Sequence, residues 1–269
     1  MCELFALSAR HPATVDVSLD EFASHGSTAG RSHDGWGIAY SEDHDACLLK
    51  EAEPAAPSDW VRFIESHHIR SRTVLAHIRH ATRGGVSFEN TQPFVRELGG
   101  RAHVFAHNGD LPKLEDARLP TGRFRPMGET DSELAFCGLL TLLEEPWLRG
   151  EPSVEERIET VREFARRIRA LGPANFLYTD GRILFAHGDR RRSAPGEPLQ
   201  PPGLHVLERR CTAGAAARSG AGVRVTPHPA EQRVLLVASV PLTEEAWRPL
   251  GEGTLLVMSD GRRVAEETA

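Results

Sequence analysis

The cysteine at position 2 is the side chain with the clearest potential for covalent chemistry. Only Met1 precedes Cys2, and cysteine is small enough for a methionine aminopeptidase to remove that methionine. The new first residue would then carry an α-amine beside a thiol, so that base and nucleophile belong to one residue. An α-amine has a pKa of about 7.7, which suits a base working near neutral pH. The alternative is a small apolar residue that begins a strand, because unpaired cysteines are usually buried and inert.

Four further segments with polar residues or glycines lie in expected strands or at the ends of strands. They are 33–37, 77–84, 106–109 and 128–133. Arg79 follows an apolar strand, and its planar guanidinium suits two-point contact with a carboxylate, although a structural ion pair would use it equally well. Asn108-Gly109 is the strongest short signal for a type I′ hairpin turn. Residues 110–112 do not resemble a returning strand, which weakens the hairpin interpretation.

In this order behind Cys2, the segments resemble class II glutamine amidotransferases, which belong to the N-terminal-nucleophile hydrolase superfamily. The resemblance is closest to small stand-alone members without a fused synthase domain. It runs from Cys2 through Asp131 and continues more weakly over 175–187 and 234–257. It implies an α+β fold, a four-layer αββα sandwich of two mainly antiparallel sheets, with residues 1–269 in a single domain.

For Cys2, the resemblance implies attack on the side-chain amide of glutamine or of another γ-glutamyl compound. The resulting γ-glutamyl thioester is then resolved by water. Asn108 would donate its side-chain N–H, and Gly109 its backbone N–H, to the oxyanion that forms. A glycine lets the backbone approach the substrate closely, and loss of one oxyanion donor typically costs about 100- to 1000-fold in rate.

The resemblance also implies a two-point clamp for the amino-acid end of the substrate. Arg79 would hold the α-carboxylate with help from Thr82, and Asp131 would bind the α-ammonium group. Asp131 has a compatible structural role, because the helix dipole favours a carboxylate in a first helical turn. His80 is expected to support these substrate contacts from one layer behind them.

Some positions of the motifs have a less definite role. Arg83 stands where the large multidomain relatives usually have histidine, and Gln92 where many relatives have it. These departures concern the details of the substrate pocket and leave the nucleophile, the oxyanion donors and the clamp unchanged. Trp36, between two glycines, is expected in the core or the pocket wall. Arg31 is a weaker candidate for a basic residue that sets the conformation of the site.

The elements that must position these residues follow from apolar periodicity and turn residues. Strands are expected over 2–8, 36–40, 47–50, 73–78, 101–107, 175–178, 182–187, 234–240, 255–258 and 262–264. Helices are expected after the N-caps Ser18, Ser58, Thr130 and Ser153, with Glu21, Glu133 and Glu156 at capping-box positions. Asp-Gly pairs at 180–181 and 260–261 predict hairpins. Paired strands with helices grouped in the middle favour antiparallel sheets over βαβ alternation.

Composition and charge exclude several function classes. The 269-residue chain has a net charge of −6, so it lacks the basic footprint of a nucleic-acid-binding protein. No apolar run is long enough for a membrane span, and no leader is visible before Cys2, so a cytoplasmic location is expected. The basic run 190–192 lies in a Pro- and Gly-rich stretch, which predicts an exposed loop and, as the minor alternative, an anion site.

No metal or organic cofactor is expected. The four cysteines show neither a CxxC pair nor regular spacing, which argues against a zinc ribbon or a disulfide framework. His77 and His80 are three residues apart, which places them on opposite faces of a strand. His77 is therefore expected to pack within its strand.

The sequence leaves the leaving group of the small-molecule substrate open. Glutamine is the leading substrate, and the second hypothesis is another γ-glutamyl amide or peptide, as in relatives that act in ergothioneine biosynthesis. In a third hypothesis ammonia passes to a separate synthase subunit, which an exposed apolar patch at the pocket mouth would favour. A non-enzymatic binding subunit has the least support, because Cys2, Arg79, Asn108, Gly109 and Asp131 are all present. A homo-oligomer is compatible with the sequence, whereas nucleic acid and membrane are not expected partners.

Overall fold

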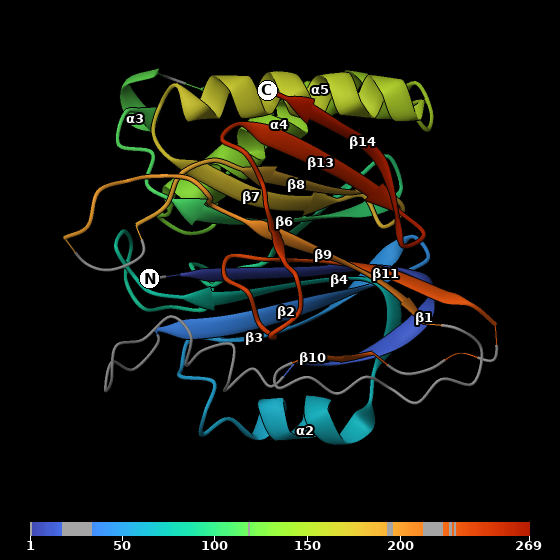
Figure 1. Ribbon diagram of the computed structural model, residues 1–269. Coiled ribbons are helices and arrows are strands. Elements are labelled where there is room, and N and C mark those ends of the chain that lie inside the picture. The colour runs from blue at the N-terminus through green and yellow to red at the C-terminus, as the bar shows by residue number, and fades with distance from the viewer. Residues whose placement is uncertain are drawn as a thin grey trace.

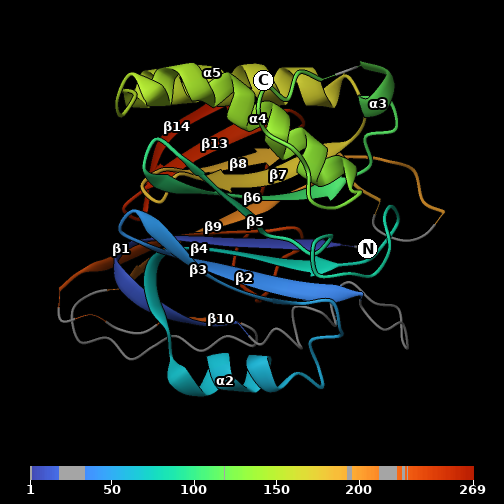
Figure 2. The ribbon, with the colours of Figure 1, turned by 180° about the vertical axis from the view of Figure 1, so that it is seen from behind.

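The computed structural model describes residues 2–17, 34–117, 119–192, 196–211, 223–225, 228 and 230–269. Two sheets lie face to face in the middle of the molecule, and helices lie on both outer sides of the pair (Figure 1). The view from behind shows the same succession of layers (Figure 2). This arrangement confirms the α+β, four-layer αββα fold. The helix expected after Ser18 falls outside the described residues.

The larger sheet has eight strands. They are β1 (Glu3–Val17), β2 (Gly35–Glu42), β3 (Asp45–Glu51), β4 (Arg70–Arg79), β9 (His205–Cys211), β10 (Val223–Val225), β11 (Gln232–Ala238) and β12 (Arg248–Pro249). Their order is β12-β9-β11-β1-β4-β2-β3, with β10 paired to β1 beside this path. Each pairing is antiparallel, as the hairpin pattern predicted. Helix α2 (Asp59–His67) covers the outer face of this sheet.

The smaller sheet has six strands. They are β5 (Phe94–Leu98), β6 (Arg101–Gly109), β7 (Ala174–Thr179), β8 (Leu184–Gly188), β13 (Thr254–Ser259) and β14 (Arg262–Thr268), in the order β14-β13-β8-β7-β6-β5. Two long helices, α4 (Asp131–Leu148) and α5 (Val154–Arg169), cover its outer face, and the short α3 (Leu114–Ala117) precedes them. None of the helices in the described part of the chain combines the length and the apolar character that crossing a membrane requires.

Side-chain alternation along the strands divides the apolar core into three layers. On β4, Val74 and Ile78 pack toward α2, whereas Leu75 packs between the sheets. On β6, Phe105 packs toward α4 and α5, whereas Ala106 packs between the sheets. Because side chains alternate with a period of two, Arg79 and Asn108 extend the two inward-facing rows at the strand ends.

The helix N-caps expected from the sequence are formed, with one correction. Ser58, Thr130 and Ser153 each accept a backbone N–H of the first turn. Glu156 closes a capping box with Ser153, but Glu133 does not close one with Thr130. The fully buried Glu133 instead pairs with Arg96 and accepts the N–H of Gly128 at 2.7 Å, because a buried carboxylate is stabilised best by a cation.

The two Asp-Gly pairs form different turns. Asp260 and Gly261 have φ values of 48° and 67° between β13 and β14, which fits the predicted two-residue hairpin turn. Asp180 instead accepts the N–H groups of Arg182 and Ile183, both at 3.0 Å, so that β8 begins only at residue 184. The first strand is also longer than predicted, since β1 passes a register shift between residues 8 and 13 and continues to residue 17.

Candidate active site

Cys2 lies at the start of β1, beside the end of β4. The register pairs Glu3 with Ile78, so Cys2 reaches the loop that follows β4. The thiol of Cys2 donates to the carbonyl oxygen of His80 at 3.3 Å, and the N–H of His80 donates to Sγ at 3.2 Å. The thiol is therefore fixed next to Arg79, the residue predicted to bind the α-carboxylate of the substrate.

Opposing effects act on the pKa of the Cys2 thiol. Burial raises this pKa above its usual value, because the thiolate loses hydration. The N–H of His80 and the charge of Arg79 lower it, whereas the carboxylate of Glu3 raises it further. The net shift is upward, so a nucleophilic thiolate at this position requires a base that accepts the proton.

Asn108 and Gly109 end β6 directly opposite Cys2. The side-chain Nδ2 of Asn108 donates to the carbonyl oxygen of Cys2 at 2.6 Å. Asn108 pairs with Asn175, and Gly109 with Ala174, in the ladder between β6 and β7. The alternative of an Asn-Gly hairpin turn is therefore wrong. A side chain at Gly109 would collide with the carbonyl oxygen of residue 173, so the close packing of two backbones explains the glycine.

Asn175 supports Asn108 and was not singled out from the sequence. Its Nδ2 donates to the carbonyl oxygens of Asn108 at 3.2 Å and Arg190 at 2.9 Å, and its Oδ1 accepts the N–H of Asp189 at 2.7 Å. The carboxylate of Asp189 in turn accepts the N–H of Ala174 at 3.1 Å. The sequence did offer one signal for this role, because Asn175 is a polar residue near the start of the otherwise mostly apolar strand β7.

Arg79 is buried at the end of β4, with 3% of its surface exposed. Its Nη2 donates to the carbonyl oxygens of Arg83 at 3.2 Å and Gly84 at 3.4 Å. Its Nη1 is buried and has no hydrogen-bond partner among the described residues. Burial lowers the pKa of this guanidinium, because the cation loses hydration. An unsatisfied donor beside Cys2 favours a carboxylate ligand over the alternative of a structural ion pair.

Two aspartates hold the first residues of the loop after β4. Asp34 accepts the N–H of Ala81 at 2.7 Å and lies 3.6 Å from Nδ1 of His80. Farther along, Nε of Arg83 donates to Asp110 at 2.9 Å. Thr82 is exposed between these two anchors. The loop therefore reaches from β2 to the segment after Gly109, and the anchoring role of both aspartates was missed from the sequence.

Asp131 is the first residue of α4 and is tied to the segment that follows Gly109. One carboxylate oxygen accepts the N–H of Leu111 at 2.8 Å, and the other accepts the N–H of Ser132 at 2.8 Å. These bonds bring Asp131 to the same end of the sandwich as the oxyanion donors. They also fit the structural role of a carboxylate in a first helical turn.

Burial disfavours the charged forms of the buried histidines near the site. His77 is fully buried, with no hydrogen-bond partner for either ring nitrogen among the described residues, and burial lowers its pKa to about 3. His107 has a pKa lowered by burial, and its Nδ1 lies 2.9 Å from the hydroxyl of Ser132. Within the described ranges, no three or more His, Cys, Asp or Glu residues gather where they could hold a metal ion.

The glycines around Trp36 bring two segments together. Trp36 is fully buried in the core between the larger sheet and α2, and its Nε1 donates to Glu51 at 3.1 Å. A side chain at Gly37 would collide with the carbonyl oxygen of Gln92. The side chain of Gln92 exchanges two hydrogen bonds with the backbone of His107, at 2.6 and 3.1 Å. Gln92 therefore braces β6 one residue before Asn108.

Arg191 corrects the expectation of an exposed basic loop. It is 8% exposed, and its guanidinium contacts both carboxylate oxygens of the fully buried Glu3, at 2.8 and 3.2 Å. Burial of a carboxylate requires such a partner, and the partner comes from a distant loop. The backbone of Arg191 also exchanges hydrogen bonds with Gln200, both at 3.1 Å.

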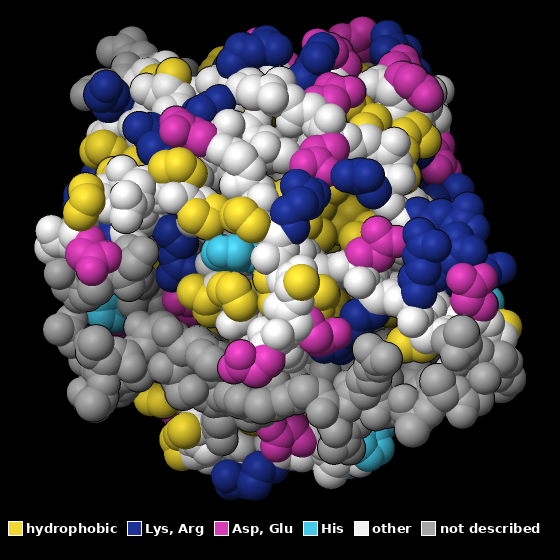
Figure 3. Space-filling view, viewed as in Figure 1, with side chains coloured by type: hydrophobic (Ala, Val, Ile, Leu, Met, Phe, Trp, Pro, Cys, Tyr) yellow, Lys and Arg dark blue, Asp and Glu magenta, His cyan; other side chains and the backbone are white. Residues whose placement is uncertain are grey.

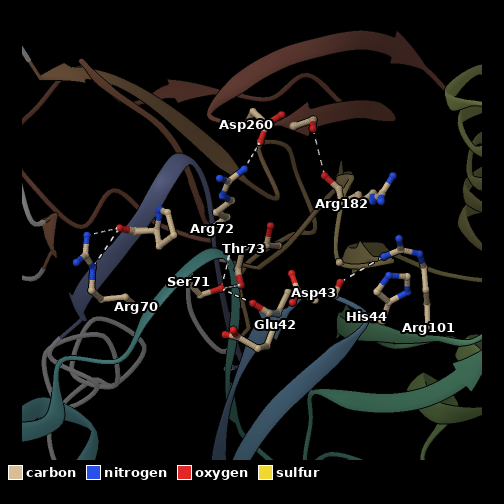
Figure 4. A pocket seen from close by; sticks show the side chains of 14 residues that line it. Glu42, Asp43, His44, Arg70, Ser71, Arg72, Thr73, Arg101, Arg182 and Asp260 are labelled. Atoms are coloured by element: carbon tan, nitrogen blue, oxygen red, sulfur yellow. Dashed lines mark hydrogen bonds and ion pairs between the residues drawn. The ribbon is translucent and has the colours of Figure 1, made fainter. Parts of the chain in front are cut away.

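A cavity of about 870 Å³ lies at the opposite end of the sandwich, around the start of β4 (Figure 4). At about 3.3 Å per residue, the length of β4 puts about 30 Å between this cavity and Arg79. The cavity therefore does not belong to the site of Cys2. Its arginines already have partners, such as Asp260 for Arg72 and the carbonyl oxygen of Pro12 for Arg70.

Basic and acidic side chains are interspersed on the face of the molecule that Figure 3 shows.

Known proteins are similar to this chain in sequence and in fold. A family model described as "Glutamine amidotransferases class-II" matches residues 1–269. The Escherichia coli (strain K12) protein named "Putative glutamine amidotransferase YafJ" is 34% identical over 271 residues, covering 98% of this chain and 100% of that protein. A crystal structure of a "predicted glutamine amidotransferase" from Pseudomonas aeruginosa PA01 is 31% identical, with a TM-score of 0.70. It covers 98% of this chain and 100% of that one.

A solved structure with lower sequence identity also has a similar fold. The glutamine phosphoribosylpyrophosphate amidotransferase from B. subtilis is 15% identical and has a TM-score of 0.59. The likeness covers 99% of this chain and 49% of that one. At this identity it concerns the fold alone, and it agrees with the sandwich of two sheets between helices.

Proposed function

Since this chain belongs to the class II glutamine amidotransferase family, we propose that it hydrolyses a γ-glutamyl amide, with glutamine as the leading substrate. One observation carries the proposal. The thiol of Cys2, the amide of Asn108 and the buried Nη1 of Arg79, which has no partner among the described residues, lie together at one end of the sandwich. They supply a nucleophile, a carboxylate ligand and an oxyanion donor. The proposal treats residues 1–269 as one catalytic domain.

The raised thiol pKa defines what the first step needs. Removal of Met1 gives Cys2 a free α-amine, which accepts the thiol proton directly or through a water molecule. The thiolate then attacks the amide carbon, and the negative charge moves to the amide oxygen. Asn108 and the N–H of Gly109 stabilise this oxyanion. Collapse expels ammonia with the proton that the amine carried, and water hydrolyses the γ-glutamyl thioester to release glutamate.

In this proposal the site recognises γ-glutamyl compounds by their charged amino-acid end. Nη1 of Arg79 binds the α-carboxylate, Thr82 assists from the exposed loop, and Asp131 binds the α-ammonium group. His80 holds Sγ through its backbone and approaches Asp34 through its ring, so it positions the site without touching substrate. The leaving group lies outside this clamp and is not selected by it.

A covalent label tests the nucleophile. A diazoketone that mimics glutamine is expected to add one equivalent to Cys2 and to abolish amide hydrolysis, whereas Cys2→Ser protein remains unlabelled. Intact mass should show that the active protein lacks Met1. Active protein that keeps Met1, or labelling that persists in Cys2→Ser, would show that the proposed nucleophile and base are wrong.

A second candidate function is the transfer of ammonia to a separate synthase subunit. It is favoured by three exposed apolar side chains near the proposed substrate site, called here the apolar rim. Val86, Phe88 and Met127 are 55%, 59% and 70% exposed. Asn90 joins their two loops, because its side chain donates to the carbonyl oxygen of residue 85 and accepts the N–H of residue 129. The first loop also holds Arg79 through residues 83 and 84, so the apolar rim borders the proposed substrate site.

Two measurements separate these functions. A panel of γ-glutamyl amides ranks the leaving groups, and a preference for one bulky amide over glutamine would favour a dedicated hydrolase. Phe88→Ser tests the rim, because loss of a docking residue should leave glutamine hydrolysis intact and abolish co-purification of a synthase. If Phe88→Ser instead alters the ranking of the amides, the rim contacts the leaving group and the docking function is wrong.

A further inference from the structure

We propose that Arg191 and Glu3 form a positioning pair that fixes the nucleophile-bearing end of β1 and balances the negative charge next to it. The proposal rests on the assignment of Cys2 as the nucleophile. The pair joins a residue adjacent to Cys2 to a loop that lies 188 positions farther along the chain.

The contact between the two residues has the geometry of a two-point ion pair. Nη2 of Arg191 lies 2.8 Å from one oxygen of Glu3, and Nη1 lies 3.2 Å from the other. Glu3 has no exposed surface, and Arg191 is 8% exposed. A planar guanidinium that meets both oxygens of a carboxylate fixes its direction as well as its distance.

A third segment completes this anchor. Nη1 of Arg191 also donates to the carbonyl oxygen of Ser239 at 2.7 Å. The hydroxyl of Ser239 accepts the N–H of Leu4 at 2.9 Å. The backbone N–H of Ser239 donates to the carbonyl oxygen of Leu4 at 3.0 Å. The two residues that follow Cys2 are therefore held from outside β1. Among the described residues the thiol itself has hydrogen bonds only with the backbone of His80, so the anchor at Glu3 and Leu4 supplies the second constraint on its position.

Charged and titratable groups act on the Cys2 thiol directly or through one intervening residue. Glu3 of β1 and Arg79 of β4 act on it directly, and the backbone N–H of His80 donates to it. Around these residues, Arg191 pairs with Glu3, Asp34 lies beside the ring of His80, and His77 of β4 lies near Arg79 and His107 of β6. His205 of β9 lies near Arg191. Burial lowers the pKa values of His77, His107 and His205, which favours their neutral forms. Glu3 and Arg79 act on the thiol with opposite sign.

The position of Arg191 explains how a buried carboxylate is tolerated beside a nucleophile. Glu3 alone opposes formation of the thiolate, because two negative charges would lie on neighbouring residues. Arg191 contacts both carboxylate oxygens of Glu3 and offsets that charge. A buried ion pair is weak evidence of stabilisation, since well-packed apolar residues often replace one at no cost. Its place next to Cys2 therefore favours a role in the reactivity of the thiol.

The pH dependence of Cys2 alkylation tests the pair without requiring turnover. Full-length Arg191→Gln protein is treated with iodoacetamide from pH 5 to 10, and modification of the N-terminal peptide is followed by mass spectrometry. We expect the midpoint of the profile to rise by about one pH unit, equivalent to a tenfold lower thiolate fraction at pH 7. Glu3→Gln is expected to lower the midpoint below that of the wild type. The double variant should return close to the wild-type value, because both charges are absent.

A buried pair elsewhere in the chain provides the matched control. Arg157 of α5 contacts Asp180 at 3.0 Å, and both side chains are almost fully buried. Arg157→Gln should lower the melting temperature without moving the alkylation midpoint. If Arg191→Gln and Glu3→Gln also leave the midpoint unchanged, the pair is structural and the proposal is overturned. If Arg191→Gln does not fold, Glu3→Gln alone tests the proposal. A midpoint below that of the wild type supports the charge effect, and an unchanged or higher midpoint overturns it.

Kinetics separate this proposal from the proposed function. In Arg191→Gln protein the turnover number should fall while KM for a γ-glutamyl amide stays near the wild-type value, because the clamp is intact. A rise in KM alone would contradict a role at the nucleophile. If the wild type hydrolyses no γ-glutamyl amide, the proposed function fails, but the alkylation midpoints still report on the pair.

Discussion

Arg79 shows how a single residue can combine structural and ligand-binding contacts. One terminal nitrogen secures the loop after β4, and the other is buried without a partner among the described residues. Burying a donor without a hydrogen bond costs about 1–3 kcal/mol. A carboxylate that reaches Nη1 removes this cost and adds a charge-assisted hydrogen bond. The binding energy for the proposed substrate is therefore concentrated on its α-carboxylate.

Arg79→Gln is expected to reduce kcat/KM about 10- to 100-fold for every γ-glutamyl substrate, mainly through KM. The reason is the loss of a hydrogen bond between charged groups, worth about 1.5–3 kcal/mol. Steady-state kinetics on several γ-glutamyl amides measure the effect. The neighbouring Arg83, which contacts Asp110, provides the matched control, and Arg83→Gln should change KM less than about threefold. An equal effect of both substitutions would argue against a carboxylate ligand at Arg79.

At the scale of elements, the site joins the ends of strands from two different sheets. Cys2 and Arg79 come from the larger sheet, and Asn108 comes from the smaller one. The first turn of α4 adds Asp131, which binds the backbone of Leu111. The relative position of these groups therefore depends on how α4 begins and on how β6 ends.

Thr130→Ala should destabilise the protein by about 1 kcal/mol and raise KM for the γ-glutamyl substrate. Thr130 caps α4 through the N–H of Glu133 at 3.2 Å, and loss of the cap loosens the turn that carries Asp131. Chemical denaturation and steady-state kinetics measure the two effects. Ser153→Ala removes the equivalent cap of α5 and should give a similar loss of stability with KM unchanged. The clamp assignment of Asp131 is contradicted if the two variants have the same KM.

At the scale of the whole molecule, three histidines are buried in different parts of the core and carry no charge. Burial lowers the pKa of His77 to about 3, and those of His103 and His187 to about 4. An unfolded histidine has a pKa of about 6.5, so the unfolded chain binds more protons than the folded one between these values. Stability is therefore greatest above pH 6.5 and decreases as the pH falls.

We expect the free energy of unfolding to fall by about 1.4 kcal/mol per pH unit for each of these histidines between pH 6 and pH 4.5. Urea denaturation at several pH values measures the slope. His103→Gln should reduce the slope by about one such increment, because the burial that lowers the pKa of His103 is then removed from the balance. A slope that is the same in the wild type and in His103→Gln would mean that His103 is not neutral in the folded state.

Local hydrogen bonding explains which parts of the fold and the site were predictable. The caps Ser58 and Ser153 bond backbone groups two or three residues away, and the Asp260-Gly261 turn joins neighbouring strands. Such contacts depend on residues close together in the chain, so short patterns identify them. The candidate residues Cys2 and Asn108 were likewise found from the order of short motifs, and the fold followed from the family resemblance.

Contacts between distant segments were decided only by the tertiary structure. Glu133 pairs with Arg96 instead of closing a capping box, and Asn175 supports Asn108 from the neighbouring strand. Arg191 was expected to be exposed, yet it is buried against Glu3. Each side chain is buried, and the segment packed against it determines its partner. The sequence by itself therefore determined most of the strands, the caps and the identity of the candidate nucleophile, whereas β5, β9, β10 and β12 were not predicted. Tertiary packing determined which charges surround that nucleophile, because only burial brings them within reach of it.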